Sequence, residues 1–283
     1  MNKKDINSVK EFWENNPLFS GESEFEIGSK EFFNEHRRVY IEDVFANDFK
    51  EVQFIPKLSQ ESRVLDLGCG VGFWTIEMLR FGGYKNMYSA DLTQAALDNV
   101  AKRLKINNMN STLSIQNAEN MTFEDNFFNH INCQGVIHHT PDTEKTIEEM
   151  ARVLKDNGTA YISVYYKNIF LRNWKFLQYL GKLLSKFGAN LKGRGREDIF
   201  TQNDVDEITR LYDGKENPIG KSYSKKEVIS LVGDKFYIDE MFLNFFPARS
   251  LPFKIPNFLH KFLSKNMGFM IHLSLRKKSA CAE

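Results

Sequence analysis

Three glycines on alternate positions follow a short apolar run, and this segment has the residue types that a ligand-binding turn needs. The run 64–67 leads directly into Gly68, Gly70 and Gly72, and a helix-forming segment begins at Phe73. A strand, a glycine turn and a helix in this order let the backbone approach a nucleotide-like ligand without a Cβ in the way. We therefore predict a binding site at this turn.

Two carboxylates near the turn indicate the charge of the ligand. Asp66 lies at the tip of the predicted strand, where it would repel a pyrophosphate but attract a positively charged group. Asp91 ends the next predicted strand, about 20 residues after the turn, where one carboxylate can accept hydrogen bonds from both hydroxyls of a ribose. A dinucleotide-binding turn places its third glycine three positions after the second, whereas here Phe73 stands at that position. The pattern as a whole favours a cationic nucleoside over a dinucleotide. Taken alone, either aspartate could equally well be an ordinary turn or helix-cap residue.

Alternating strands and helices should hold this turn in place. The helix that begins at Asp142 or Thr143 is expected to end at 157–158, and Ser224 with Glu227 forms a capping box at the start of another helix. This alternation predicts an α/β fold with a seven-stranded, mostly parallel sheet and helices on both faces. Strands are expected over 63–67, 86–91, 112–116, 129–134, 159–165, 236–243 and 267–275.

The chain divides into four predicted segments around this sheet. Residues 1–55 form a helical lid or simply pack against the sheet, and residues 56–166 form the ligand-binding core. Residues 167–222 form a basic, aromatic helical insert after the fifth strand, and residues 223–283 complete the sheet.

The insert has an unusual charge pattern. No Asp or Glu occurs between residues 157 and 196, and Lys and Arg alternate there with large apolar residues. Three interpretations remain open: an amphipathic lid over a hydrophobic acceptor, a patch for an acidic membrane surface, or a nucleic-acid contact. The balanced total charge, 38 Lys and Arg against 37 Asp and Glu, disfavours the last. Members of the pattern include Lys167, Phe170, Arg172, Trp174, Lys175, Phe187, Lys192, Arg194 and Arg196.

Composition limits the remaining classes. The three cysteines, Cys69, Cys133 and Cys281, share no CxxC spacing, which favours reduced thiols in a cytoplasmic protein without a structural metal. The first residues lack the apolar stretch of a secretory signal, and no run is long enough to span a membrane.

Five segments together resemble the class I S-adenosylmethionine-dependent methyltransferases, most closely the small-molecule group that includes quinone and sterol methylases. The resemblance covers roughly residues 63–165. It implies a Rossmann-like fold, S-adenosyl-L-methionine as cofactor and S-adenosyl-L-homocysteine as product, and it leaves the acceptor open. The segments are Val64–Gly72, Asp91–Leu92, Asn117–Glu119, Gly135–Asp142 and Ala151–Lys155.

The same resemblance implies roles for individual residues in binding the cofactor. Asp66 should hold the amino group through water, Asp91 the ribose, and Leu92 one face of the adenine. Asn117 should meet the adenine edge, where family members usually carry Asp, and an amide oxygen can still accept that hydrogen bond. Gln134 should offer its carbonyl to the ammonium group. The full set of expected cofactor contacts is Asp66, Gly68, Cys69, Gly70, Gly72, Trp74, Asp91, Leu92, Thr93, Asn117, Ala118, Glu119 and Gln134.

Catalysis would need alignment of the acceptor behind the methyl group, and a base only where the acceptor must lose a proton. His138 and His139 are the candidate bases for a phenol, alcohol or protonated amine; two consecutive residues should point to different sides, so at most one should face the acceptor. A thiol or carbanion would need neither. Enclosure of the acceptor is expected from Trp13, Arg38, Tyr40, Tyr166, Phe170 and Trp174.

The sequence thus predicts in-line methyl transfer to a small, apolar or aromatic organic acceptor by a monomer or homodimer. Two alternatives remain: a non-catalytic cofactor-binding protein whose acceptor cavity is plugged, and a methyltransferase that acts on a membrane-associated lipid or quinone through contact of the insert with the membrane.

Overall fold

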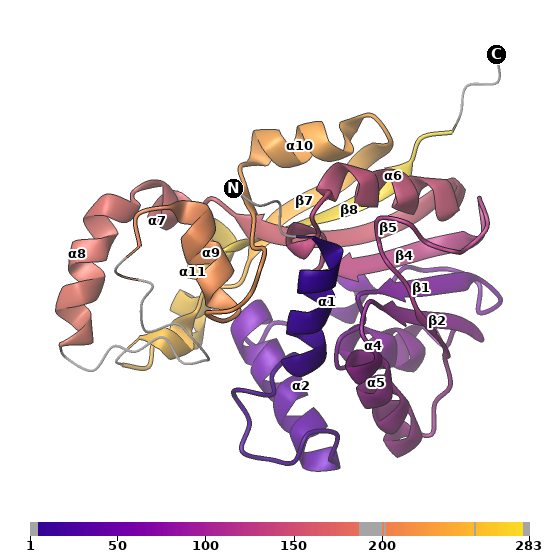
Figure 1. Ribbon diagram of the computed structural model, residues 1–283, viewed down its shortest axis with the longest axis horizontal. Coiled ribbons are helices and arrows are strands. Elements are labelled where there is room, and N and C mark those ends of the chain that lie inside the picture. Colours follow the sequence, from indigo (N-terminus) through magenta and orange to yellow (C-terminus); the bar gives the residue numbers. More distant parts are fainter. Residues whose placement is uncertain (1–4, 187–199, 201, 252, 280–283) are drawn as a thin grey trace.

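The computed structural model describes residues 5–186, 200, 202–251 and 253–279 and shows one sheet flanked by helices (Figure 1). Seven strands follow the order β3-β2-β1-β4-β5-β8-β7, and the two-residue β6 pairs with β5. Neighbours from β3 to β5 are parallel, whereas β8 runs antiparallel to both β5 and β7. The predicted seven-stranded, mostly parallel sheet is confirmed, with one short extra strand. The bounds are β1 Arg63–Leu67, β2 Asn86–Asp91, β3 Thr112–Ile115, β4 Phe128–Gln134, β5 Leu154–Tyr166, β6 Ser222–Tyr223, β7 Phe236–Asn244 and β8 Met270–Lys277.

The central strands are buried on both faces, which explains their apolar sequences. Four of the five residues of β1 are buried, and Leu65 and Ile131 are fully inaccessible. In register, Asp66 lies beside Ser89 of β2 and Asn132 of β4. The carboxyl ends of β1, β2 and β4 therefore meet at one edge of the sheet, where ligands bind in folds of this kind.

Helices cover both faces, as predicted. The helices α4 (Phe73–Gly82) and α5 (Gln94–Asn107) lie on one side of the sheet, and α6 (Thr143–Val153) and α10 (Lys225–Gly233) lie on the other (Figure 1). The predicted capping box at the start of α10 is present, with Ser224 and Glu227 bonded to each other's backbone N–H groups.

Polar contacts anchor the N-terminal helices α1 (Ile6–Asn15), α2 (Lys30–Phe45) and α3 (Glu51–Phe54). The Glu14 carboxylate accepts from the backbone N–H groups of Gln94 and Ala95, at 2.9 and 3.0 Å, and so caps α5 from outside. The Arg37 guanidinium grips the fully buried Glu77 carboxylate of α4 with two bonds of 2.9 and 3.0 Å. These contacts hold α1 and α2 over the ligand edge of the sheet.

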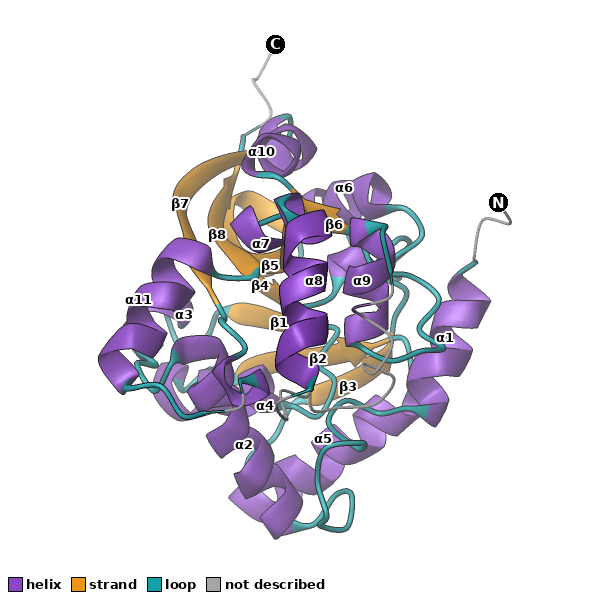
Figure 2. Ribbon diagram, turned by 90° about the vertical axis from the view of Figure 1, so that its left-hand side faces the viewer, coloured by secondary structure: helices purple, strands orange, loops and turns teal. Residues whose placement is uncertain are grey.

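In its described residues, the segment after β5 contains the helices α7 (Ile169–Arg172), α8 (Trp174–Ser185) and α9 (Val205–Tyr212), set to one side of the sheet. Figures 1 and 2 show α8 as the outermost of them. The predicted charge pattern is described here only in part, because Phe187, Lys192, Arg194 and Arg196 lie outside the described residues. No helix within the described ranges is both long and apolar enough to pass through a bilayer.

Two predicted boundaries were wrong. The helix α6 ends at Val153 rather than at 157–158, because Leu154 already pairs with Phe128 and a bulge absorbs the residues up to Thr159. The last strand begins at Met270, because α11 (Asn257–Met267) occupies the preceding residues. The sequence pattern did not reveal α11, since its buried residues, His260 and Ser264, are polar and Phe258 and Phe262 are exposed.

Candidate active site

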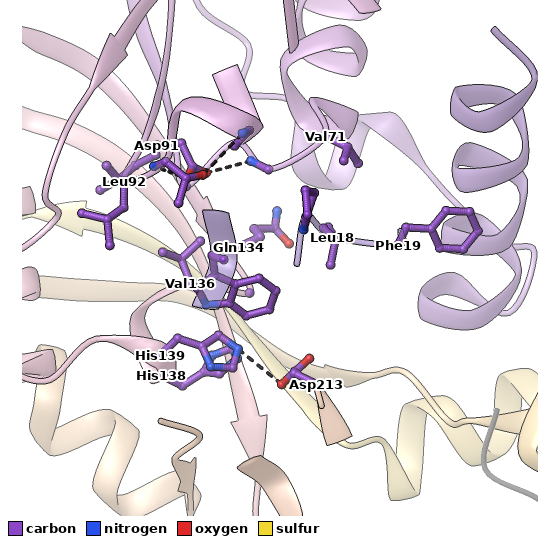
Figure 3. A pocket seen from close by; sticks show the side chains of 18 of the residues that line it. Leu18, Phe19, Val71, Asp91, Leu92, Gln134, Val136, His138, His139 and Asp213 are labelled. Carbon is purple, nitrogen blue, oxygen red and sulfur yellow. Dashed lines mark hydrogen bonds and ion pairs between the residues drawn. The ribbon is translucent and has the colours of Figure 1, made fainter. Parts of the chain in front are cut away.

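A cavity of about 310 Å³ lies at the carboxyl ends of β1, β2 and β4 and beneath α1 and α2 (Figure 3). Eight of the residues expected to contact the cofactor line it, and four more expected near the acceptor do so as well. The former are Gly68, Gly70, Asp91, Leu92, Thr93, Asn117, Ala118 and Gln134; the latter are Trp13, Tyr40, His138 and His139.

The glycine turn requires glycine for two separate reasons. Gly68 has a φ of +71°, and a Cβ at this position would collide with the Val136 side chain. Gly70 has a φ of +51° and donates its N–H to Asp91 Oδ2 at 3.0 Å. The turn thus presents bare backbone to the cavity and holds the Asp91 carboxylate at the end of β2.

Asp91 is fixed from both sides while it lines the cavity (Figure 3). Its Oδ1 accepts from the Thr93 N–H at 3.1 Å and the Thr93 hydroxyl at 2.9 Å. Burial raises the pKa of the Asp91 carboxyl, and the bonds from Gly70 and Thr93 partly oppose that rise. A carboxylate oxygen has further lone-pair sites, so this group can still accept hydrogen bonds from a ligand hydroxyl.

Asp66 lies behind the cavity and is not one of its lining residues. Its carboxylate is 2 % exposed and accepts from the Thr75 hydroxyl at 2.7 Å and from Asn132 Nδ2 at 2.8 Å. Asn132 Oδ1 in turn accepts from Gln134 Nε2 at 3.0 Å, and Gln134 lines the cavity. The Asp66 carboxylate is therefore connected to the cavity through the side-chain amides of Asn132 and Gln134. Burial raises the pKa of Asp66 to about 6, against the bonds from Thr75 and Asn132.

Three buried polar atoms among the cavity-lining residues lack a hydrogen-bond partner within the described part of the chain. They are His36 Nδ1, Gln134 Oε1 and His138 Nδ1. An unpaired buried polar atom is unfavourable by roughly 1–3 kcal/mol, and a bound polar ligand removes that penalty. Gln134 Oε1 and His138 Nδ1, with the Asp91 carboxylate, fit a ligand that brings several hydrogen-bond donors.

The two adjacent histidines face the same cavity, which contradicts the expectation that they point to different sides. They lie in the 3₁₀ turn η1 (Ile137–His139), not on a strand, and their rings are 4.2 Å apart. His138 is 1 % exposed, and burial with the neighbouring His139 holds its pKa well below the usual value. His139 has Nδ1 2.7 Å from the Ile219 carbonyl oxygen and Nε2 3.4 Å from Asp213 Oδ2.

The far end of the cavity is apolar with one charged cluster. Arg249 contacts Asp43 with Nε at 2.7 and 2.8 Å and Glu22 with Nη2 at 3.1 Å. Burial is the largest influence on the Asp43 carboxyl and raises its pKa, against the guanidinium. The apolar lining residues beside this cluster include Val39, Val44, Phe245 and Met270, whereas Leu18 lies against Gly70 and Phe19 packs beside Val71.

Besides Asp66, eight of the expected site residues do not line the cavity. Cys69 and Gly72 pack against α5, Trp74 donates to the Tyr40 hydroxyl at 3.3 Å, and Glu119 accepts from the Asp142 N–H. Arg38 is exposed beside Glu35 and Glu42, and Phe170 stacks on Phe269. Trp174 donates to the Gln202 carbonyl, and Tyr166 is buried in the sheet core. Phe170 and Trp174 therefore stack on other aromatic rings and do not line the cavity, whereas Tyr212, which also belongs to the insert, does line it.

Several lining residues had no signal in the sequence. Tyr165, Tyr212, Asp213 and Arg249 lie near the ends of elements or in loops and line the cavity only through the tertiary fold. Asn117 lines the cavity, and its Oδ1 accepts from the Glu119 N–H at 3.0 Å in a local turn.

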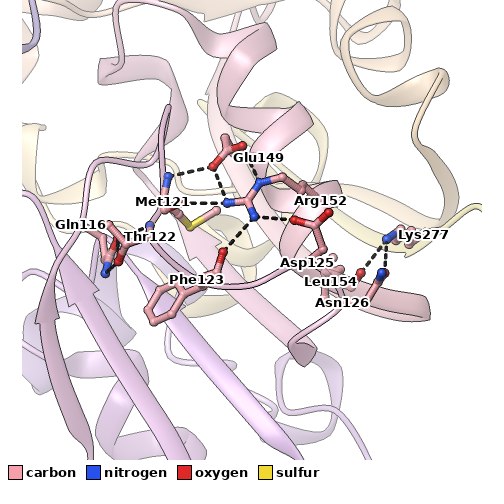
Figure 4. A network of polar contacts seen from close by, with 10 residues as sticks. All are labelled: Gln116, Met121, Thr122, Phe123, Asp125, Asn126, Glu149, Arg152, Leu154 and Lys277. Carbon is pink, nitrogen blue, oxygen red and sulfur yellow. Dashed lines mark hydrogen bonds and ion pairs between the residues drawn. The ribbon is translucent and has the colours of Figure 1, made fainter.

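A partly exposed arginine, Arg152, holds the loop that follows Ala118 (Figure 4). The Arg152 guanidinium donates to the carbonyl oxygens of Met121 and Phe123 and to the carboxylates of Asp125 and Glu149, at 2.7–2.8 Å. Glu149 also accepts from the Met121 N–H at 2.7 Å. Arginine supplies five donors in a fixed plane, so one side chain can fix this whole loop against α6.

Comparison with known proteins places this geometry in a family. Residues 64–158 match the family model described as a methyltransferase domain. The demethylmenaquinone methyltransferase of Staphylococcus saprophyticus is 26 % identical over 160 residues, which cover 53 % of this chain and 68 % of that protein. The ubiquinone biosynthesis O-methyltransferase of Bartonella tribocorum is 25 % identical over 69 % of this chain and 80 % of its own length.

A solved structure agrees with the fold. Magnesium protoporphyrin IX methyltransferase from Synechocystis PCC 6803, with bound S-adenosylhomocysteine, has a TM-score of 0.55 and 12 % identity, covering 97 % of this chain and all of the other. The glycine turn, the acid at the end of β2 and these comparisons agree with one another. Residues 64–158 form a class I S-adenosylmethionine-dependent methyltransferase domain, and the protein is an S-adenosylmethionine-dependent methyltransferase.

Proposed function

We propose that the protein transfers the methyl group to a small, neutral, apolar or aromatic acceptor held at the far end of the cavity. The observation that carries this proposal is a single cavity with two chemically different ends. One end has backbone, Asp91 and Gln134, and the other has aromatic and aliphatic side chains. A plugged cavity would favour a non-catalytic cofactor-binding protein, and the open volume of about 310 Å³ speaks against it.

The polar end would hold S-adenosylmethionine. Gly68 and Gly70 would pass beneath its amino-acid part, Asp91 would accept from the ribose hydroxyls, and Gln134 Oε1 would accept from the ammonium group. Asn117 would meet the adenine edge through its amide. When bound, this cofactor supplies an electrophilic methyl group on a sulfonium sulfur, and the remaining task of the protein is to align the acceptor and exclude water.

The charges at the acceptor end favour a neutral molecule. Among the described lining residues, Arg249 is the only Lys or Arg, and it already faces the carboxylates of Asp43 and Glu22. An acceptor carboxylate would meet two like charges beside that single cation. The aromatic side chains there suit a flat apolar body.

Binding and transfer can be tested separately. Calorimetry should show binding of S-adenosylhomocysteine and no binding of NAD, and Asp91→Ala should weaken the former while the protein stays folded. Incubation with a metabolite extract and cofactor carrying a labelled methyl group should then yield labelled neutral aromatic products by mass spectrometry. Cofactor binding without any labelled small molecule would contradict the proposed activity, and labelled carboxylic acids alone would contradict the acceptor class.

A second candidate is an acceptor that resides in a membrane, because α8 exposes an apolar stripe. Phe176, Tyr179 and Leu183 are 73, 74 and 52 % exposed at helical spacing, and Lys175 and Lys186 beside them are exposed as well. Lysines beside exposed aromatic residues suit the surface of an anionic bilayer.

Sedimentation with vesicles tests this candidate. The protein should bind phosphatidylcholine vesicles that contain phosphatidylglycerol and should bind pure phosphatidylcholine vesicles weakly. The double variant Phe176→Ser/Tyr179→Ser should lose binding, whereas Tyr237→Ser, which removes an equally apolar ring that is 52 % exposed on β7, should keep it. Equal binding by both variants would refute the membrane contact.

A further inference from the structure

We propose that His139 and Asp213 form a proton-accepting pair and that the methylated atom of the acceptor is a hydroxyl oxygen. This inference rests on the proposed function, since it concerns the acceptor end of the same cavity. The pair joins the turn after β4 to the end of α9, segments 74 residues apart in the sequence (213 − 139). Figure 3 shows the two side chains meeting at the cavity.

The hydrogen bonds of His139 determine which nitrogen is available. Nδ1 lies 2.7 Å from the Ile219 carbonyl oxygen, which can only accept, so Nδ1 carries the proton in the neutral ring. Nε2 is then the basic atom, and it lies 3.4 Å from Asp213 Oδ2. The side chains of His139 and Asp213 are 9 and 14 % exposed, so water screens their attraction only partly.

Tyr165 positions the carboxylate. Its hydroxyl lies 2.9 and 3.0 Å from the two Asp213 oxygens and donates to them. Asp213 caps the end of α9, and Tyr165 and Asp213 both line the cavity. This support holds the Asp213 carboxylate beside Nε2. A negative charge there would stabilise the imidazolium formed when His139 takes a proton.

Among the described residues, the other side chains in contact with His139 are not carboxylic acids. His138 from η1 is neutral, because its pKa lies well below the usual value, and its ring is 4.2 Å from that of His139. From α1, Trp13 meets the ring edge-on at 5.4 Å. The nearby cation, Lys221, points its ammonium group at the carbonyl oxygens of Thr140 and Pro141. His138 is thus a wall of the site, and His139 is the base.

The chemistry of the pair selects the acceptor atom. The hydroxyl oxygen gives one lone pair to the new oxygen–methyl bond, the electron pair of the broken sulfur–methyl bond stays on sulfur, and the hydroxyl proton goes to His139 Nε2. A thiol loses its proton near neutral pH without help, whereas a phenol with a pKa of about 10 does not. A built base therefore indicates an acceptor that needs one.

One readout needs no acceptor. Nitrogen NMR of the protein saturated with S-adenosylhomocysteine should place the proton of the neutral His139 ring on Nδ1. In Asp213→Asn the tautomer should be unchanged, but the ring should protonate at a lower pH than in the native protein. A proton on Nε2 of the neutral ring, or identical titration of the two proteins, would overturn the pair.

The second readout compares two acceptors that differ in one atom, 2-naphthol and 2-naphthalenethiol. At neutral pH, His139→Gln and Asp213→Asn should each lower kcat for the naphthol at least tenfold and leave thiol methylation within twofold, and Tyr165→Phe should have a smaller effect of the same kind. Affinity for S-adenosylhomocysteine should stay unchanged in all three variants. Raising the pH should restore naphthol methylation in Asp213→Asn, because the acceptor then ionises by itself.

The outcomes separate this inference from the proposed function. Equal losses on both acceptors would show a structural role for the pair, and a native protein that methylates the thiol alone would overturn the hydroxyl assignment. A native protein that binds S-adenosylhomocysteine and methylates neither compound would overturn the proposed acceptor class, and with it the role of the pair.

Discussion

Replacing Asp66 by asparagine should make the protein more stable at neutral pH while weakening its affinity for the cofactor. The Asp66 carboxyl is buried at 2 % exposure behind the cavity, and its pKa in the folded protein is about 6 instead of 3.8. Because the folded pKa is raised, ionisation is less favourable in the folded than in the unfolded chain. The stability of the native protein is therefore full below the unfolded pKa and falls as the pH rises through about 6.

The size of the effect follows from the shift. A rise of about two pKa units corresponds to about 3 kcal/mol of lost stability above the folded pKa, at 1.36 kcal/mol per unit. Asparagine removes the charge and can keep each hydrogen bond. Its oxygen accepts from Asn132, and its amide donates to the Thr75 hydroxyl, which turns its own hydrogen toward Ser89 at 2.9 Å.

Urea unfolding of Asp66→Asn and the native protein, at pH 5 and pH 8, measures this directly. The variant should be more stable by about 1.5 kcal/mol at pH 5 and about 3 kcal/mol at pH 8, since the carboxyl is mostly protonated in the folded native protein at the lower pH. Its affinity for S-adenosylmethionine should fall, because a negative charge behind Gln134 is gone. A variant that is less stable than the native protein at both pH values would refute the assignment of Asp66 as a destabilising buried charge.

Three further predictions concern the glycine turn, Asp91 and the loop held by Arg152. Gly68→Ala should lower the free energy of unfolding measured in urea. Adding Val136→Ala should recover this loss except for about 1 kcal/mol, which is the backbone strain of alanine at a positive φ. No recovery would mean that the collision with Val136 is not the cause of the loss. Asp91→Asn should raise the Kd for S-adenosylhomocysteine about tenfold or more by calorimetry, because an amide is a weaker acceptor for hydroxyls than a carboxylate. Arg152→Lys should destabilise by about 2 kcal/mol, since one ammonium cannot replace the planar fork; Glu149→Gln should show a smaller loss in the same urea assay, and the reverse order would contradict the network.

Local signals in the sequence determined the elements that build the site. The strand 63–67, the glycine turn and Asp91 at the end of β2 were all predicted, because strand burial, positive φ and strand ends depend on residues close together in the chain. The start of α10 was predicted from the reciprocal bonds of Ser224 and Glu227, which lie three residues apart. The wrong end of α6 shows the limit of this reasoning, since pairing of Leu154 with another strand overrode a local stop signal.

Tertiary packing alone decided how the side chains meet. Asp66 is buried away from the cavity and is connected to it only through hydrogen bonds with Asn132 and then Gln134. The 3₁₀ turn brings His138 and His139 to the same cavity. Asp213 reaches His139 only because α9 ends beside that turn. Periodicity reports which face of an element is buried, but it carries no information on which distant element covers that face. The cofactor end of the site, built within consecutive strand–helix units, was therefore predictable from the sequence, whereas the acceptor end, assembled from distant loops and helix ends, was not.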